Sequence, residues 1–191
     1  MHRKGRNRSA LNKLDINKVI EDKGYYDKYG EWNSIIRSRR YPGKLFRGRV
    51  EVFIFRDDCV YIELYPDGTY RIPGGSFDIR RSNHDQVYNE AKEEARVIIN
   101  TIRYTGYSYH KLKDKPYISK DNKTISWDGT YNKIYIAEFS GYYSGKVSIY
   151  AQDNAMYNYG NFVHISKIYD RLTDIHKQAL QQKLKTLGMT L

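Results

Sequence analysis

The stretch that decides the fold is Pro73–Val97, which reads PGGSFDIRRSNHDQVYNEAKEEARV. Its double glycine, Gly74-Gly75, lets the backbone turn tightly and approach another group without the obstruction of a Cβ. A helix is predicted to begin near Asn83, which can cap the backbone with Gln86 completing a capping box, and to run to about Arg96. The rest of the chain is therefore interpreted around a glycine loop that leads into a helix rich in carboxylates.

The predicted helix has a buried face and a charged face. At 100° per residue, Val87, Ala91 and Ala95 fall within a sector about 80° wide, which we expect to pack on a sheet. A neighbouring sector about 100° wide holds three carboxylates, those of Glu90, Glu93 and Glu94. Glu90 and Glu94 form a like-charged i,i+4 pair, a repulsion that a hard divalent cation would relieve. Two interpretations stay open on these residues alone, an ordinary solvated face and a cage for a divalent metal.

The spacing of this stretch resembles the Nudix box, G-x5-E-x7-R-E-U-x-E-E-x-G-U, in which U is aliphatic. With the first glycine of the pattern on Gly75, the pattern fits through Val97 without insertion or deletion. The residues at the positions that hold the metal in that family are Glu90, Glu93 and Glu94. The resemblance thus implies a metal site on this helix.

Three positions depart from the family pattern. Arg81 stands at the isolated glutamate, Asn89 at the arginine and Arg96 at the second glycine. In the family, the isolated glutamate and the arginine help to fix the geometry of the loop and the helix. Their replacement by Arg81 and Asn89 predicts the loss of a supporting interaction, with the carboxylate cluster intact. Arg96 in place of glycine predicts a changed helix exit.

The order of elements indicates one mixed α/β domain. From Arg49 the run RVEVFIFRDDCVYIELY is rich in β-branched and aromatic residues, with a polar turn at Asp57-Asp58 between two strands. Further strands are predicted in VIINTIRYTGYSY and YNKIYIAEFSG, and a helix with a core-packing stripe in TDIHKQALQQKLKTL. The resemblance implies a Nudix-like α/β/α sandwich with a mixed sheet over residues 46–191.

Residues 1–45 are predicted to form a basic N-terminal extension, with a short helix over residues 11–23. The first forty residues hold eleven Lys or Arg and five acids. One interpretation is a solvated arm that packs Trp32 on the main domain. The other is an arm that contacts nucleic acid, RNA in particular.

Composition limits the classes of function. The formal net charge of +11 over 191 residues favours anionic partners such as phosphates, nucleotides or nucleic acid. A single cysteine, Cys59, excludes an intramolecular disulfide framework and a multi-cysteine zinc site. The first residues lack the apolar run of a signal peptide and no stretch approaches 18 apolar residues. We therefore expect a cytoplasmic protein without a membrane partner.

The resemblance implies hydrolysis that depends on Mg²⁺ or Mn²⁺. The expected substrate is a nucleoside diphosphate linked to another moiety, so the protein is expected to be a pyrophosphohydrolase. Glu90 is the candidate for shared metal and base duty, with Glu93 and Glu94 as further ligands, while Gly74 and Gly75 form the phosphate loop.

A further carboxylate often comes from outside the box in this family. Glu138, on the strand YNKIYIAEFSG, and Asp153, in the segment after it, are the candidates. The alternative to an enzyme is a catalytically weakened Nudix-fold module that binds a nucleotide or RNA, which the replacements at Arg81, Asn89 and Arg96 favour.

Overall fold

The computed structural model describes residues 19–27, 32–64, 69–78, 80–111, 117–146 and 160–188. The strands of this part are β1 (Val19–Tyr26), β2 (Trp32–Ser38), β3 (Tyr41–Arg56), β4 (Cys59–Leu64), β5 (Tyr70–Arg71), β6 (Gly74–Ser76), β7 (Val97–Lys111), β8 (Tyr117–Ile118), β9 (Thr124–Ile125), β10 (Gly129–Tyr142) and β11 (Gly160–His164). Its helices are α1 (Asn83–Glu93) and α3 (Asp174–Thr186), and two short 3-10 helices, η2 (Ile165–Lys167) and η3 (Tyr169–Arg171), lie between β11 and α3.

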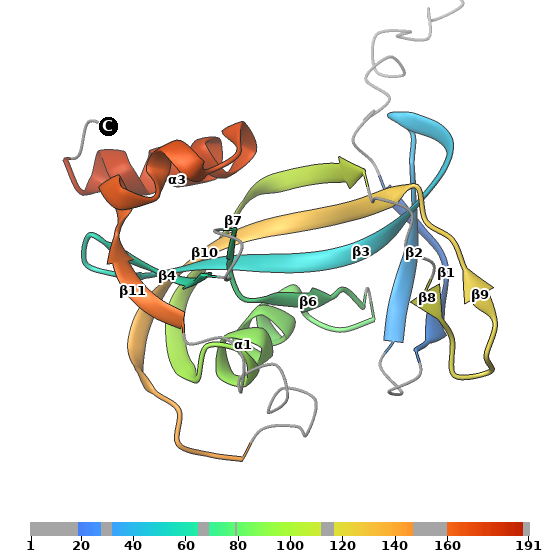
Figure 1. The fold of residues 1–191 in the computed structure, drawn as a ribbon, viewed down its shortest axis with the longest axis horizontal. Helices are drawn as coiled ribbons and strands as arrows, with labels where there is room; N and C mark the ends of the chain where they lie inside the picture. Colours follow the sequence, from blue (N-terminus) through green and yellow to red (C-terminus); the bar gives the residue numbers. More distant parts are fainter. Residues whose placement is uncertain are drawn as a thin grey trace, which may run out of the picture.

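A mixed sheet forms the centre of the molecule (Figure 1). Its main path runs β1-β2-β3-β10-β7, in which β3 and β10 are parallel and the other neighbours are antiparallel. β2 pairs with the first half of the long strand β3, whereas β6 and β4 pair with its second half. Because β4 also pairs with β5 and β11, the second half of β3 carries a separate group of short strands.

The two α-helices of the described residues cover opposite faces of this sheet (Figure 1). Val50, Val52 and Ile54 of β3 are buried in one hydrophobic core with α1, while Phe53 and Phe55 are buried in a second core with α3. The period-2 alternation of the strand supplies both cores at once. The fold is thus an α/β/α sandwich with a mixed sheet, as predicted. Neither helix is long and apolar enough to cross a membrane.

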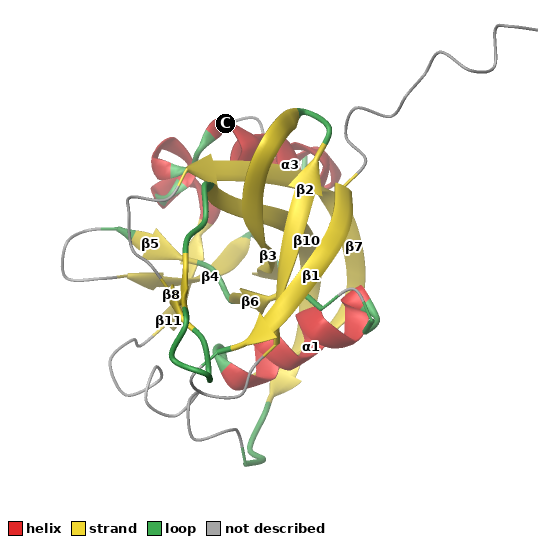
Figure 2. Ribbon diagram, turned by 90° about the vertical axis from the view of Figure 1, so that its right-hand side faces the viewer, coloured by secondary structure: helices red, strands yellow, loops and turns green. Residues whose placement is uncertain are grey.

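The N-terminal part differs from the predicted extension. Residues 1–18 lie outside the described part of the chain. The strands β1 and β2 belong to the central sheet (Figure 2). Residue 45 lies within β3 rather than at a boundary. The helix expected over residues 11–23 is wrong for residues 19–23, which are part of β1. Ile35 and Ile36 of β2 are buried, so the β1-β2 pair contributes apolar side chains to the interior of the protein.

The N-cap of α1 is Ser82, one residue before the predicted cap Asn83. The Ser82 hydroxyl accepts from the Asp85 backbone N–H at 3.5 Å, and Asn83 is the first helical residue. Gln86 does not close a capping box, because its side chain is hydrogen-bonded back into the preceding loop. The helix ends at Glu93, with Glu94 as its C-cap residue, a little before the predicted end near Arg96.

Candidate active site

Strand β6 places the double glycine between β3 and α1. Gly74 is paired with Glu51 and Gly75 with Val50. A Cβ on Gly74 would overlap the Val50 carbonyl oxygen, and one on Gly75 would overlap the carboxylate of Glu90. The absence of a Cβ therefore lets Gly74 pack closely against β3 and lets Gly75 pack closely against Glu90 of α1.

The carboxylates of Glu90 and Glu94 meet this loop. Glu94 Oε2 accepts from the Gly74 backbone N–H at 2.7 Å, and the Glu90 carboxylate lies against Gly75. Burial raises the pKa of Glu94, and the negative charge of Glu93 raises it further. Glu90 and Glu94 thus contact the glycine loop, and the negative charge of Glu93 acts on Glu94.

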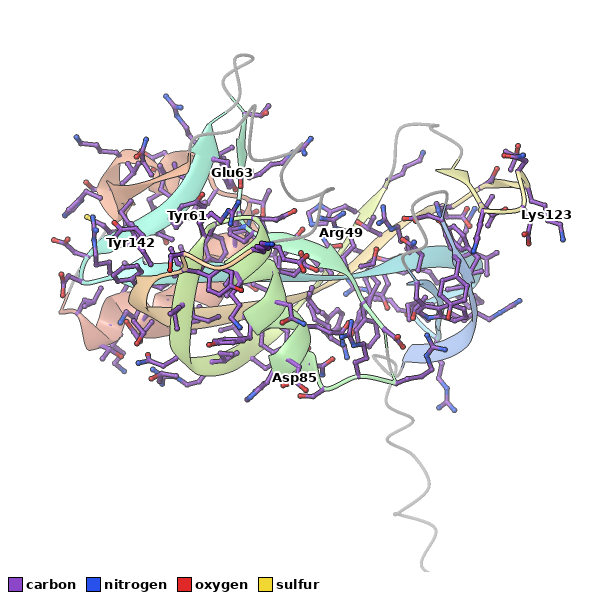
Figure 3. All side chains as sticks on the ribbon, turned by 90° about the horizontal axis from the view of Figure 1, so that it is seen from below. Arg49, Tyr61, Glu63, Asp85, Lys123 and Tyr142 are labelled. Carbon is purple, nitrogen blue, oxygen red and sulfur yellow. The ribbon has the colours of Figure 1, made fainter. Side chains whose placement is uncertain are left out.

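A fourth carboxylate, which sequence reasoning missed, lies beside them. Glu63 of β4 is only 7% exposed, and burial together with the charge of Glu94 raises its pKa to about 7. Tyr61 lies two residues earlier on the same strand, and burial followed by the charges of Glu63 and Glu94 raises the pKa of its hydroxyl. Figure 3 shows Tyr61 and Glu63 near one another, with Arg49 farther along the sheet. The available signal was an acid inside the apolar run VYIEL.

Two arginines lie at the border of this cluster. Arg49 Nη2 donates to the Gly74 carbonyl oxygen at 2.9 Å, so the same glycine links Arg49 to Glu94 through its two backbone groups. The charges of Arg49 and Arg71 oppose the effect of burial on the pKa of Glu94, and Arg71 does the same for Glu63. The cluster is therefore a mixed-charge site in which cations flank the carboxylates.

Gln86 and Asp78, at positions that the Nudix pattern leaves unspecified, support the loop between β6 and α1. Gln86 Oε1 accepts from the Asp78 N–H at 2.6 Å, while Gln86 Nε2 donates to the Asp78 carbonyl at 2.9 Å. Asp78 in turn accepts two side-chain hydrogen bonds from Arg80, which also hold the pKa of Asp78 below its usual value. Hydrogen bonds of Gln86 and Arg80 with Asp78 thus hold the loop against the first turn of α1.

Arg96 adopts a backbone conformation that favours glycine. Its φ of 56° lies in the left-handed region. The Arg96 carbonyl accepts from the Tyr143 N–H at 2.8 Å, and Arg96 Nη1 donates to the Gly145 carbonyl at 3.0 Å. These two bonds tie the residue to the end of β10 in a conformation that costs a non-glycine residue about 1 kcal/mol.

The two acids proposed from outside the box do not join the cluster in the described part of the chain. Glu138 accepts from Lys183 Nζ at 2.5 Å, and Lys183 belongs to α3 on the other face of the sheet. Asp153 lies outside the described residues. Glu63 is the acid from beyond the box that the structure brings to Glu94.

Carboxylate oxygens are the ligands that Mg²⁺ and Mn²⁺ prefer, and mutual repulsion is what such a cation relieves. Among the described residues, no three His, Cys, Asp or Glu side chains are placed so that they could hold a metal ion together. The donor set of Glu63, Glu90, Glu93 and Glu94 nevertheless fits the cation in chemistry, since Glu63 and Glu94 have pKa values raised by burial and by a neighbouring carboxylate.

A pocket of about 760 Å³ adjoins the cluster on the face of the sheet that α3 covers. Residues of β3, β5, β10 and the first turn of α3 line it. Arg49 and Arg71 belong to this lining and also act on the pKa of Glu94. The two arginines therefore connect the pocket to the carboxylates.

The solved structures to which this chain is similar include Nudix hydrolases. No protein-family model and no curated protein matches the chain. A Nudix hydrolase of Nitrosomonas europaea is 15% identical over 75% of this chain and 92% of its own, with a TM-score of 0.49. A MutT Nudix hydrolase of Burkholderia pseudomallei is 20% identical over 71% and 96%, with a TM-score of 0.48. A mutant pyrophosphohydrolase of Bacillus subtilis is 15% identical over 87% and 98%, with a TM-score of 0.49.

Proposed function

We propose that this protein is a Nudix-type pyrophosphohydrolase that depends on Mg²⁺ or Mn²⁺ and cleaves a nucleoside diphosphate linked to another moiety. The observation that supports this most directly is the meeting of Glu90 and Glu94 at the Gly74-Gly75 backbone, with Glu63 buried beside them. Carboxylates held together at a glycine loop, with arginines at the border, suit an anionic substrate that arrives with a metal ion.

Each residue of the cluster has a role in this proposal. Glu90, Glu93 and Glu94 hold the metal, and Glu90 also orients or deprotonates the attacking water. Glu63 takes the place first proposed for Glu138 or Asp153, as the carboxylate from outside the box. Arg49 holds Gly74 and faces the diphosphate. The metal, when bound, neutralises phosphate oxygens and lowers the pKa of water.

The test is release of phosphate or nucleoside monophosphate from a panel of nucleotide sugars, ADP-ribose, dinucleoside polyphosphates, nucleoside triphosphates and capped RNA. Assays run with Mg²⁺, with Mn²⁺ and with chelator. Glu94→Gln and the double variant Glu93→Gln, Glu94→Gln are expected to lose about 100-fold or more of kcat/KM. Asp85→Asn is the matched control, because Asp85 is an exposed acid in the first turn of the same helix. Wild-type turnover no greater than that of the double variant would end the enzyme proposal.

The second candidate is a catalytically weakened Nudix-fold module that binds a nucleotide or RNA. Two observations favour it, the replacements at Arg81 and Asn89 and the lack of a ready three-carboxylate metal group among the described residues. Saturable binding of a panel member without turnover, and without dependence on Glu93 or Glu94, would support this candidate over the hydrolase.

A further inference from the structure

The pocket beside α3 is rich in positive charge. Three of its lining residues are arginines, Arg49, Arg71 and Arg171, whereas Glu51 is its one carboxylate among the lining residues. A cleft lined mainly by charges of one sign, with walls of low dielectric, attracts ligands of the opposite sign. The lining therefore favours an anionic group.

The single carboxylate is already engaged. Glu51 Oε1 accepts from Asn132 Nδ2 at 2.8 Å, and Glu51 Oε2 lies 3.4 Å from His176 Nε2. His176 Nδ1 is in turn 3.1 Å from the Tyr70 hydroxyl. The Glu51 carboxylate is thus hydrogen-bonded by residues of the pocket wall, and the three arginines outnumber it, so that the lining favours negative charge.

The position of the arginines divides them into two sets. Arg49 and Arg71 lie at the carboxylate end of the pocket, because Arg49 donates to the carbonyl of Gly74, whose N–H donates to Glu94, and Arg71 is the strand partner of Glu63. Arg171 lies on η3, just before the N-terminus of α3, whose first turn also lines the pocket. A diphosphate at the carboxylates would thus leave Arg171 for a different anionic group of the same ligand.

We propose that this pocket binds a phosphomonoester that the ligand carries in addition to its diphosphate, with Arg171 as the residue that selects for it. Guanidinium groups bind phosphate with two parallel hydrogen bonds, which gives them an advantage over other cations in such a role. The inference rests on the proposed function for the placement of the diphosphate, and it names the substrate class as diphosphates that bear an extra phosphate.

Matched pairs of ligands test this directly. NADP⁺ differs from NAD⁺ by one phosphomonoester, and coenzyme A differs from its dephosphorylated form in the same way. Equilibrium affinities are measured by calorimetry with EDTA present, so that no metal-dependent turnover takes place. Wild type is expected to bind at least one phosphorylated member about tenfold or more tightly than its partner.

Variants locate the preference. Arg171→Gln is expected to reduce the ratio of affinities to about twofold or less, and Arg171→Lys to restore part of it. Lys185→Gln is the matched control, because Lys185 is an exposed cation of α3 that does not line the pocket. Its ratio should equal that of wild type. Arg171 is exposed, so its variants are expected to fold, which thermal melting checks.

Each remaining result overturns the inference. These are equal affinity within both pairs, binding of neither member, a ratio unchanged in Arg171→Gln, or an equal loss in Arg171→Gln and Lys185→Gln. The hydrolysis assay is separate. Turnover with Mg²⁺ but no preference would retain the proposed function and remove this inference, whereas a preference located at Arg171 without turnover would do the reverse.

Discussion

Gly75 and Glu90 depend on each other at the scale of single residues. The missing Cβ of Gly75 is the space that the Glu90 carboxylate occupies. Gly75→Ala should therefore displace Glu90, lower kcat/KM about 10- to 100-fold and destabilise the fold by about 1–3 kcal/mol. Enzyme assay and urea denaturation measure both quantities.

Gly141→Ala is the control for this substitution, because an added Cβ at Gly141 of β10 meets no atom within 4 Å. Its stability is expected within about 0.5 kcal/mol of wild type. Equal effects of the two alanines would show that Gly75 has no special relation to Glu90.

Arg96 is a second residue whose backbone decides its mutational behaviour. With φ at 56°, a β-branched side chain is strained and glycine is relaxed. Arg96→Val is expected to cost about 1–2 kcal/mol of unfolding free energy, whereas Arg96→Gly should stay within about 1 kcal/mol of wild type. Arg96→Ala separates the lost hydrogen bond to Gly145 from the strain. A glycine variant less stable than the valine variant would contradict this account.

Glu51 and His176 join two elements, β3 and α3, across the sheet-to-helix boundary. Burial alone would raise the pKa of Glu51, but the hydrogen bond with His176 and the charge of Arg49 lower it from 4.5. A carboxyl group with a lowered pKa in the folded state contributes stability above its unfolded pKa, and this contribution is lost as pH falls through the folded value.

The prediction concerns the difference between wild type and Glu51→Gln. At pH 6 wild type is expected to be more stable by about 2–3 kcal/mol, since the variant loses a buried charged hydrogen bond. The difference should shrink as pH falls below 4.5. Urea denaturation at steps between pH 6 and pH 3 measures it. A constant difference over that range would show that the Glu51 charge is not the source.

Elements with strong local patterns could be predicted from the sequence. The turn at Asp57-Asp58 lies between β3 and β4 as expected, and Ile134 and Ile136 of β10 face the α3 core while Tyr135 and Ala137 face the other. The polar break between two apolar runs predicts the turn, and the period-2 alternation of β10 predicts its two faces.

Features that depend on long-range pairing could not be predicted in this way. β1 and β2 are strands because they pair with each other and β2 pairs with the start of β3. Neither the charged run in β1 nor the adjacent Ile35 and Ile36 in β2 gives a clear alternation. Glu63 joins the candidate site only because β4 brings it beside the end of α1. The alternation of β10 predicts that Glu138 lies on the same face as Ile134. Which face α1 covers depends on tertiary packing, so the alternation could not show that Glu138 lies away from the α1 glutamates.

At the scale of the whole molecule, the N-terminal residues carry an excess of positive charge that neither proposed site uses. Residues 1–18 include six Lys or Arg and one acid. Since β1 begins at Val19, a truncation for testing RNA contact has to stop at residue 18, because removal of residues 1–40 would also remove two strands of the central sheet. The thermal stability and small-nucleotide hydrolysis of a chain without residues 1–18 are expected to equal those of the full chain.

RNA affinity is where this truncation should act. Each cation that neutralises a phosphate of a single strand contributes about 0.7 to the slope of log K against log salt, so loss of six cations should reduce that slope by at most about 4. Binding of a single-stranded RNA is measured by fluorescence anisotropy at about 50 to 300 mM KCl, a range over which the Debye length shortens and the screening of charges increases. A full-length variant with the six cations replaced by Gln is the matched control and should follow the truncation. An unchanged slope in both would exclude RNA contact by residues 1–18.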